Sequence, residues 1–499
     1  MLAPYDVIVV GAGGSGLAAA VSAAEAGGRV LVLEKRPEPG GTTGIAVGSF
    51  TAAKTRWQQA AGVVDSCADH AVDAGKFAAE AIEARNDGEL RAFFLGEAAA
   101  TLQWLAGFGL QFVGPSPEPP NRVPRMHNVV PGAKAYIAAL HLALQRHGGE
   151  LRCNAAVQRL LVEDGRVRGV EIRDDHGLTQ IRATRAVILA AGDYANNPEM
   201  IARYKGARFA EIEGINPFAE GDGHTLAADV GAELRNMDVT YGPELRFVAS
   251  RRKPFQQYLP TSGPWAKLLG FVAGHSPAWL MRAMIKRLLV TWQHPENALF
   301  DDGAILVNRL GERFVDERQW PEREIAVARQ PDKVAFLLLD AQLIRRYSAW
   351  PHFISTAPDI AYAYVADYLR LRPDVAIQGV SLEQLAAARG IDGQRLAETV
   401  TSHNEMAEMR EPDPRKLTGP PWVLLGPVKA YFTTTEGGAA INQRLQVLDK
   451  TGRSIPGLYA VGQNGLGGMI LWGHGLHIAW AMTSGRLAGR AAMANSPEC

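Results

Sequence analysis

Hydrophobic and polar positions follow a β-α-β pattern over residues 5–35. The apolar run at 7–10 predicts a buried strand, which leads directly into a glycine turn and a helix of small residues. A second apolar strand follows and ends at Glu34. These elements predict the opening unit of a parallel sheet with a helix packed against it.

Further patterns predict helices and strands in turn. Residues 72–110 and 131–149 have helical patterns, and the alternating residues of 151–189 predict short strands. The apolar strand 186–191 then runs into a glycine. Residues 381–389 predict another helix.

The glycines of the first turn indicate its chemistry. Gly11, Gly13 and Gly16 form G-x-G-x-x-G directly after the strand. Gly11 permits a tight turn, Gly13 lets the backbone approach a pyrophosphate, and Gly16 lets the helix pack closely. Glu34, about 20 residues further on, can accept hydrogen bonds from a ribose diol. The sequence therefore predicts that the chain binds a dinucleotide.

A second nucleotide-facing segment lies near the far end of the chain. Residues 455–462 predict a short strand followed by glycine, and residues 473–489 predict a glycine turn that opens a helix. That helix N-terminus can place amides against the pyrimidine end of a flavin. Residues 40–43 add flexible backbone and two hydroxyls near the phosphates. A nicotinamide dehydrogenase needs no such second segment, so the pattern favours FAD over NAD.

These segments define the predicted organisation. Residues 1–237 and 426–499 are expected to form a discontinuous, Rossmann-like α/β domain that binds FAD. Residues 238–425, which are richer in Trp, Tyr, Pro and Arg, are expected to form an inserted α+β cap domain. The substrate should then bind in the seam between the two domains.

Composition excludes some partners. Lys+Arg and Asp+Glu are both 52 among 499 residues, so the net charge of the chain favours neither nucleic acid nor an anionic membrane. Cys67, Cys153 and Cys499 offer no zinc spacing and no disulfide framework, so no metal is expected. The same cysteines and the absence of an export signal before the first strand indicate a cytoplasmic location. Iron–sulfur and haem motifs are absent, so electrons are expected to come from an external donor or to leave to an external acceptor.

The best candidate for membrane contact is residues 266–293. The longest charge-free run in it, 268–281, is 14 residues, whereas spanning a bilayer takes about 20. The segment is therefore expected to pack over the FAD domain. Peripheral membrane contact, or a wall for an apolar substrate, remains open.

Several long segments carry a specific resemblance. They include AVILAAGDYANNPEM at 186–200, AILVNRLGERFVDE at 304–317 and TTTEGGAAIN at 433–442. In these segments, and nearly end to end, the chain resembles the superfamily of FAD flavoproteins that contains fumarate reductases and 3-ketosteroid dehydrogenases. The resemblance implies hydride transfer at the flavin N5 and chemistry at a carbon–carbon bond beside a carbonyl group.

The resemblance also implies which residues line the flavin, which is expected to bind non-covalently. They are Gly11, Gly13, Gly14, Ser15, Gly16, Glu34, Lys35, Gly41, Thr42, Thr43, Val47, Val157, Ala191, Gly192, Asp222, Gly462, Gly475, Leu476 and Ile478.

The catalytic groups of that superfamily are replaced here. Fumarate reductases place a proton-delivering arginine shortly after the segment that matches 313–317, and the aligned residue is Pro321. Ketosteroid dehydrogenases carry a tyrosine in that neighbourhood and another about where Leu471 stands. No arginine follows Leu471 before Arg486, so the clamp for a dicarboxylate is missing. Fumarate and succinate are therefore not expected as substrates.

Three residues are candidates for proton transfer. His474 lies in the glycine turn expected beside the isoalloxazine, where it can donate a proton or bind a carbonyl oxygen; the alternative is a hydrogen-bonded histidine with a structural role. His477 is either catalytic or a contact of the flavin and the helix start. Tyr241 is a candidate acid or oxyanion donor, with core packing as the alternative.

Other candidates concern substrate binding. Arg318 and Arg246 are candidates to pair with an anionic substrate, although such residues are most often solvated. Trp320 and Trp472 are candidates for an apolar wall, and His127 is a further candidate.

We therefore expect an FAD-dependent oxidoreductase that dehydrogenates or reduces a carbon–carbon bond adjacent to a carbonyl group of an apolar, cyclic substrate. Two alternatives stay open. One is an oxidase or monooxygenase that uses oxygen at the reduced flavin. The other is a flavin-binding subunit that has lost its catalytic groups. The sequence does not define the oligomeric state.

Overall fold

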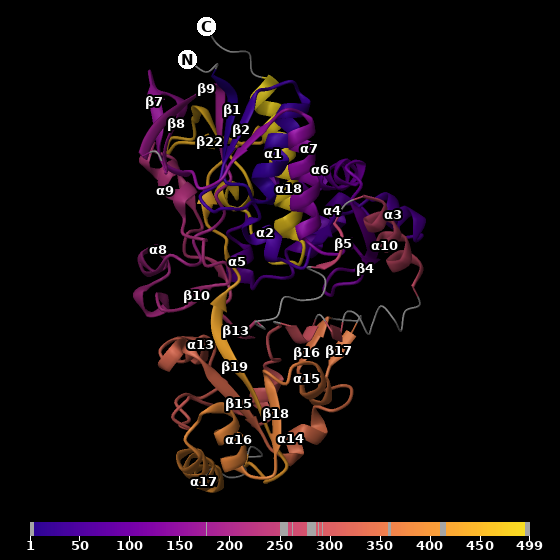
Figure 1. Cartoon of the computed structure of the whole chain (residues 1–499), viewed down its shortest axis with the longest axis vertical. Coiled ribbons are helices and arrows are strands. Elements are labelled where there is room, and N and C mark those ends of the chain that lie inside the picture. The colour runs from indigo at the N-terminus through magenta and orange to yellow at the C-terminus, as the bar shows by residue number, and fades with distance from the viewer. Residues whose placement is uncertain are drawn as a thin grey trace.

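Two bodies lie one above the other along the long axis of the molecule (Figure 1). The computed structural model describes residues 4–175, 177–249, 258–261, 263–276, 286–287, 289–291, 293–357, 361–409 and 416–494. The upper body contains both the beginning and the end of this chain, and the lower body contains much of its middle.

A parallel sheet forms the centre of the upper body. Strand β1 (Tyr5–Val10) pairs in parallel with β2 (Val30–Leu33) on one side and with β9 (Gly177–Leu189) on the other. Strand β23 (Ser454–Ala460) pairs in parallel with β9. The first and last parts of the chain therefore share one sheet. Its order is β22-β23-β9-β1-β2-β6, with β22 at Gln446–Leu448 and β6 at Glu150–Arg152.

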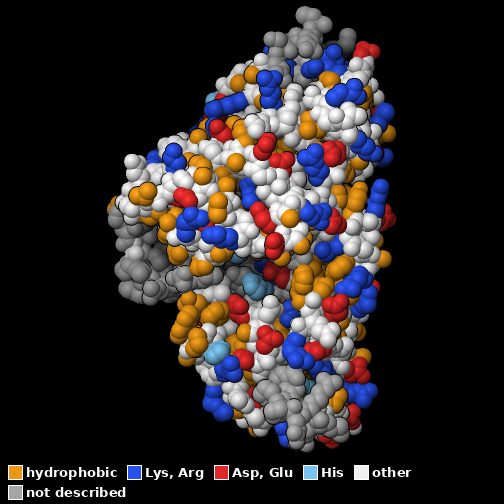
Figure 2. All heavy atoms as spheres, turned by 180° about the vertical axis from the view of Figure 1, so that it is seen from behind, with side chains coloured by type: hydrophobic (Ala, Val, Ile, Leu, Met, Phe, Trp, Pro, Cys, Tyr) orange, Lys and Arg blue, Asp and Glu red, His pale blue; other side chains and the backbone are white. Residues whose placement is uncertain are grey.

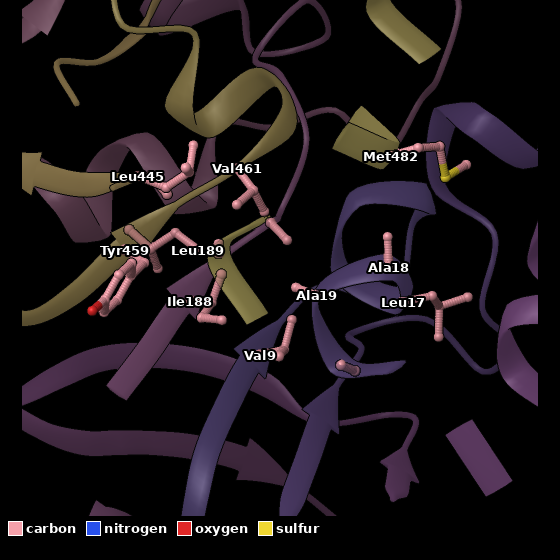
Figure 3. Packing of buried hydrophobic residues seen from close by; sticks show 14 of the residues in the cluster. Val9, Leu17, Ala18, Ala19, Ile188, Leu189, Leu445, Tyr459, Val461 and Met482 are labelled. Atoms are coloured by element: carbon pink, nitrogen blue, oxygen red, sulfur yellow. The ribbon is translucent and has the colours of Figure 1, made fainter. Parts of the chain in front are cut away.

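The core of the upper body forms where these strands meet the helices (Figure 3). Val9 and Ile188 are fully buried on neighbouring strands, and Tyr459 and Val461 come from the far end of the chain. Continuous apolar runs are typical of parallel strands, because helices cover both faces of their sheet.

The first and last helices pack closely together. A Cβ atom at Gly485 of α18 (Leu476–Ala494) would lie 2.3 Å from the carbonyl oxygen of Ser15 on α1 (Gly14–Glu25). A Cβ atom at Gly489, one turn later, would lie equally close to the carbonyl oxygen of Ala19 on α1. Small residues on both helices thus fix the C-terminal segment against the nucleotide motif.

The remaining elements of the upper body surround this unit. The predicted helix 131–149 is α7 (Lys134–Arg146), whereas the predicted helical stretch 72–110 is divided into three helices. These are α4 (Cys67–Ala74), α5 (Glu80–Glu83) and α6 (Gly88–Gly107). A small sheet contains β3 (Ser49–Thr51), β5 (Met126–Val130) and β4 (Gln111–Ser116), and the other elements are α2 (Gly41–Ile45), α3 (Arg56–Ala60), β7 (Ala156–Glu163), β8 (Arg166–Asp174), α8 (Pro198–Tyr204) and α9 (Asp222–Asp229).

A mixed sheet forms the lower body around β19 (Trp422–Phe432). The strands paired with β19 are β10 (Glu213–Gly214), β13 (Glu244–Phe247), β15 (Ala335–Leu339) and β18 (Ala376–Gly379), and β14 (Ile305–Val307) follows β15. Helices α12 (Ala298–Asp301), α13 (Glu322–Ala328), α14 (Ala341–Arg346), α15 (Val365–Leu371), α16 (Leu382–Arg389) and α17 (Gly393–Met409) and the hairpin β16 (Ser355–Ala357) and β17 (Ala361–Ala363) complete it. Ser381 caps α16, as the predicted helix 381–389 requires.

Two short antiparallel pairs lie where the chain passes between the bodies. They join β11 (Leu234–Arg235) to β21 (Gly438–Ala439), and β12 (Thr240–Tyr241) to β20 (Thr434–Thr435). A second core runs from Tyr194 to Phe432, so residues 194–212 contribute to the lower body as well. The division at 237/238 and 425/426 stays our proposal. The two separate cores support a division into two bodies, whereas β19 runs across 425/426 and the second core takes in residues from both sides of each boundary.

Helix α10 (Gly263–His275) covers the first part of the segment 266–293. It contacts β4 and β5 of the upper body, while residues 277–285 lie outside the described residues. Among the helices that the structure describes, none combines the length and the apolar character needed to cross a bilayer.

Candidate active site

The N-terminus of α1 can receive a phosphate group. Gly13 is its N-cap, and no side chain caps the first amides. A Cβ atom at Gly13 would meet only the Cα of Gly41, at 3.8 Å, so the space in front of the helix is open. Gly11 has φ +103°, and a Cβ there would lie 2.5 Å from the carbonyl oxygen of Ala190. The turn therefore requires glycine, and the open amides suit a pyrophosphate.

Glu34 lies beside this turn at the end of β2. Its carboxylate accepts hydrogen bonds from the backbone N–H of Ala12 at 2.8 Å and of Arg36 at 3.0 Å. These bonds hold it where the ribose of a dinucleotide would lie. Nearby, Lys35 forms an ion pair with Asp222 at 2.7 Å.

Residues from the far end of the chain complete the cradle. Gly462 has φ +57°, and a Cβ there would lie 2.7 Å from the Oγ of Ser15. The side chain of Asn464 accepts from the N–H of Ala191 at 2.6 Å and donates to the carbonyl of Gly192 at 2.8 Å. Asn464 was not predicted as a site residue, although it follows the predicted strand 455–462 by two residues.

The other predicted flavin residues lie on the same elements. Gly14, Gly16, Thr42, Thr43, Val47, Gly475, Leu476 and Ile478 lie on α1, on or just after α2, and at the start of α18, and Val157 lines a hollow with Asp222. An open helix N-terminus, a fixed carboxylate and a C-terminal glycine turn fit FAD.

His474 precedes α18 and faces the seam between the bodies. Its backbone N–H donates to Glu118 Oε1 at 2.8 Å, and its Nδ1 lies 2.5 Å from the same oxygen. Glu118 is buried, whereas 63% of the His474 side chain is exposed. The surrounding protein disfavours a charged imidazole, but the hydrogen bond and charge of Glu118 outweigh this and raise the pKa of His474. Histidine and acidic side chains are exposed at the seam between the two bodies (Figure 2).

A second histidine is held by another buried carboxylate. His477 Nε2 lies 2.8 Å from Oε1 of Glu436, which is fully buried on the segment between β20 and β21. The other oxygen of Glu436 accepts from the N–H of Leu471 at 3.1 Å. This pair therefore ties the start of α18 to the chain that returns from the lower body.

Two aromatic side chains lie beside these histidines. The rings of Tyr241 and Trp472 are 5.8 Å apart. Burial, reinforced by the charge of Glu244, raises the pKa of Tyr241 to about 12, so its hydroxyl stays protonated and can donate. The indole Nε1 of Trp472 is buried and has no hydrogen-bond partner among the described residues. Buried polar groups of native proteins almost always have a partner, so this unsatisfied donor is a candidate contact of a ligand.

The lower body contributes a charged cluster to the seam. Arg246 donates through Nε to Glu244 Oε1 at 2.8 Å, and Thr433 donates to the same oxygen at 2.7 Å. His294 Nδ1 lies 3.8 Å from the other oxygen of Glu244. Burial opposes the charge on Glu244, but Arg246 and His294 hold its pKa below the usual value. Burial lowers the pKa of His294, against the pull of Glu244.

The position aligned with the arginine of fumarate reductases is the N-cap of α13, Pro321. Two residues later, buried Arg323 pairs with buried Glu324 and donates to Asn297 at 2.9 Å. Burial raises the pKa of Glu324 despite this pairing. The burial of the Arg323–Glu324 pair was not predicted, because alternating charges in a helix usually indicate a solvated surface.

Three candidates lie apart from this group. Arg318 pairs with Asp316 at 3.0 Å and is partly exposed. Trp320 donates to the carbonyl of Pro243 at 2.9 Å and is largely exposed. His127 is fully buried and lies 2.8 Å from the hydroxyl of Thr55, so it cannot contact a substrate.

The fold and the site define a class of protein. A parallel nucleotide-binding sheet with an open α1 terminus, closed by a C-terminal glycine turn and faced by proton donors, is typical of a flavin-dependent oxidoreductase. The chain belongs to the family described as FAD binding domain, whose model matches residues 6–250 and 267–472.

Similar proteins agree with this family. A probable fumarate reductase of Shewanella frigidimarina is 28% identical over 97% of this chain and 74% of its own length. A vinyl phenol reductase of Lactiplantibacillus plantarum is 27% identical over 97% and 96%, and a 4-oxocyclohexanecarboxylate 2-dehydrogenase of Sinomonas cyclohexanicum is 26% identical over 97% and 92%. The open form of a flavocytochrome c3 fumarate reductase has a TM-score of 0.73 at 26% identity, over 99% of this chain and 78% of that one. The protein is an FAD-dependent oxidoreductase that acts on carbon–carbon bonds.

Proposed function

We propose that this oxidoreductase moves hydrogen to or from a carbon–carbon bond next to the carbonyl group of an apolar, cyclic substrate bound in the seam. Charge pairing around His474 carries the proposal. Arg246 pairs with Glu244, and the imidazoles of His474 and His477 lie against Glu118 and Glu436, so each of these basic side chains already has a carboxylate partner within the protein. That balance suits a neutral ketone rather than a dicarboxylate.

The residues at the α1 terminus, Glu34 and the turn before α18 would hold FAD, which when bound would supply or accept the hydride. The chain's own groups manage the proton and the carbonyl oxygen. His474 presents its Nε2 edge to the seam and exchanges a proton with the neighbouring carbon. The hydroxyl of Tyr241 and the indole N–H of Trp472 donate to the carbonyl oxygen, where negative charge develops.

His477 orients the start of α18 through Glu436. We assign no step to Arg318, because its guanidinium pairs with Asp316. The relatives named for vinyl phenol and for 4-oxocyclohexanecarboxylate support an aromatic or cyclic substrate.

Anaerobic mixing of the flavin-loaded protein with cyclic ketones tests this function. We expect saturated cyclic ketones to bleach the flavin band, or the dithionite-reduced protein to be reoxidised by cyclic enones. Succinate and fumarate serve as the controls and should be inactive. Reaction with fumarate at a rate equal to that with enones would contradict the proposal.

The same preparation separates the alternatives. Rapid reoxidation by air with stoichiometric peroxide would favour an oxidase, and incorporation of oxygen into the product a monooxygenase. A flavin that no substrate reduces or reoxidises would favour a binding subunit. Release of FAD on acid precipitation is the expected result for a non-covalent cofactor.

We also propose peripheral membrane contact through α10. The side chains of Trp265, Leu268 and Phe271 are 69%, 49% and 61% exposed on this helix. Residues 245–295 contain eight Lys or Arg residues (Arg246, Arg251, Arg252, Lys253, Lys267, Arg282, Lys286 and Arg287) and no Asp or Glu. Exposed aromatic residues within a basic segment suit an anionic lipid surface.

An external small molecule or protein is the proposed electron partner. A cytoplasmic location stays our proposal, and Cys67 and Cys153 support it because neither forms a disulfide.

A further inference from the structure

We propose that Glu118 is the positioning residue for the proton-transferring histidine, and that a buried ionic network holds Glu118 in place beneath it. The inference deepens the proposed function and rests on it. Glu118 lies on the loop between β4 and β5, and 356 residues separate it from His474.

Glu118 makes two contacts with His474 through a single oxygen. Oε1 accepts from the backbone N–H of His474 and lies 2.5 Å from its Nδ1. The first contact fixes the glycine turn, and the second fixes the plane of the ring. With Nδ1 engaged, proton exchange with a substrate is left to Nε2, as in other carboxylate–histidine pairs.

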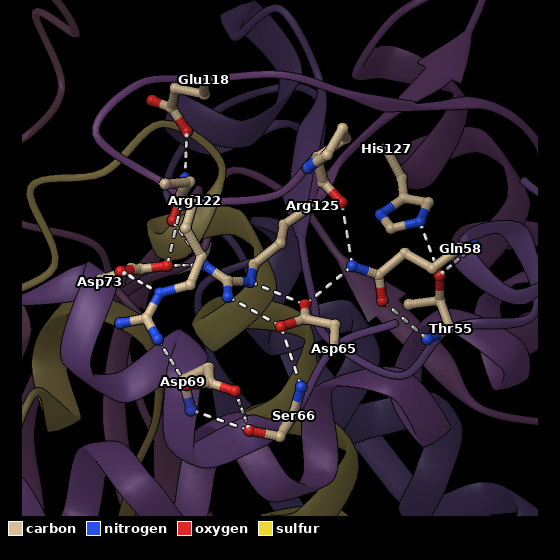
Figure 4. Close-up of polar contacts among 12 residues, drawn as sticks. Thr55, Gln58, Asp65, Ser66, Asp69, Asp73, Glu118, Arg122, Arg125 and His127 are labelled. Atoms are coloured by element: carbon tan, nitrogen blue, oxygen red, sulfur yellow. Dashed lines mark hydrogen bonds and ion pairs between the residues drawn. The ribbon is translucent and has the colours of Figure 1, made fainter. Parts of the chain in front are cut away.

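The second oxygen of Glu118 connects to the interior. Asn121 Nδ2 lies 3.4 Å from Oε2, and Asn121 Oδ1 accepts from Arg125 Nη1 at 3.0 Å. Arg125 is fully buried and pairs with Asp65 at 2.7 Å and with Asp73 at 2.6 Å (Figure 4). The carboxylate beneath His474 is therefore the outer end of a hydrogen-bonded chain.

Side chains of α3, of α4 and of the segment between them hold this hydrogen-bonded network and the loop that carries Glu118. Arg122 pairs with Asp69 at 2.6 Å and with Asp73 at 3.0 Å, both on α4. Gln58 of α3 donates to Asp65 at 2.8 Å. Two arginines thus attach the loop to α4 and to the segment between α3 and α4, so the loop cannot move without breaking buried ion pairs.

Other charged groups face His474 across the seam. Glu244 and Arg246 of β13 act on it with opposite signs, while His294 lies on the same side and Tyr241 is neutral. Among the described residues, Glu118 is the carboxylate that His474 contacts directly. Replacing Glu118 should therefore change the proton affinity of His474 more than replacing a group across the seam.

The test compares Glu118→Gln with the wild-type, FAD-loaded protein. Imidazole ¹⁵N shifts give the pKa of His474, with its signal assigned by its loss in His474→Gln. We expect the pKa to fall by about one unit or more. The limb of the flavin half-reaction that follows His474 should move to lower pH by the same amount, because the protonated form is lost earlier as the pH rises.

Two further variants keep the test decisive. Glu163→Gln removes a surface carboxylate paired with Arg182 and should change neither quantity. Asn121→Ala leaves Glu118 in place but removes its link to Arg125, and should produce a smaller fall in the same direction. Asn121→Ala also provides the test if Glu118→Gln does not retain FAD.

The outcomes separate this inference from the proposed function. An unchanged His474 pKa in both Glu118→Gln and Asn121→Ala overturns the positioning role. A lowered pKa without movement of the half-reaction limb supports the positioning of His474 by Glu118 but overturns His474 as the proton donor. A lowered pKa with a matching limb shift supports both.

Discussion

Single glycines in the first turn have different tasks, although Gly13 and Gly16 are only three positions apart in the sequence. A Cβ atom at Gly13 would project into open space, whereas one at Gly16 would lie 1.9 Å from the carbonyl oxygen of Gly11. The first position serves the ligand, and the second serves the packing of α1 on the sheet.

Alanine at these two positions should therefore have different effects. Gly13→Ala should change the free energy of unfolding of the apoprotein by about 0.5 kcal/mol or less but weaken FAD binding. Gly16→Ala should destabilise the apoprotein by about 1–3 kcal/mol through overpacking. Thermal unfolding and flavin titration measure both effects. Equal stability of the two apoproteins would contradict this division of tasks.

His474 is the residue on which the proposed chemistry depends most. His474→Gln should keep the flavin spectrum and slow the half-reaction by about 10²–10⁴-fold, which is the usual contribution of a general acid or base. His147→Gln, an exposed histidine after α7, is the matched control. Stopped-flow absorbance at the flavin band gives the rates, and equal rates in both variants would remove His474 from the mechanism.

Capping residues and buried charges determine where helices begin and end, and the periodic pattern of apolar residues in the sequence does not show them. Residues 72–110 have one continuous helical pattern, yet a new helix, α6, begins after Asp87, whose side chain accepts from the N–H of Leu90. The sequence predicted the helical character correctly, whereas local capping decided where the helices begin and end.

The buried ionic network gives a prediction at the same scale. Arg125→Met leaves Asp65 and Asp73 buried without their main partner and should cost about 3–5 kcal/mol of stability. Arg122→Met removes a partly exposed arginine that pairs with Asp73 and with the exposed Asp69, and should cost much less. The measurement is the thermal unfolding of the two variants under the same conditions. We expect the unfolding temperature of Arg125→Met to lie well below that of Arg122→Met.

The molecule as a whole brings the two ends of the chain to one cofactor and closes the seam with the lower body. Helix α10 lies to one side of this arrangement, over β4 and β5 (Figure 1). If α10 touches a membrane, the upper body rests on the lipid, because α10 packs on β4 and β5 of that body.

Vesicle sedimentation tests the contact. The protein should bind vesicles of phosphatidylserine and phosphatidylcholine, less so at high salt, and should not bind phosphatidylcholine alone. Trp265→Ala combined with Leu268→Ala should weaken binding, whereas Trp350→Ala, an exposed tryptophan of the lower body, should not. Equal binding of the two variants would rule out α10 as the contact.

The sequence by itself determined the FAD cradle and the class of chemistry. The strand, glycine turn, helix and terminal Glu34 form a local unit, and local geometry follows from local residue order. It also identified His474 as the residue in the turn before α18. Only the tertiary structure placed Glu118 under His474 and Glu436 beside His477, since these partners lie 356 and 41 residues away. Contacts between distant segments depend on how the whole chain packs, and no spacing in the sequence encodes them.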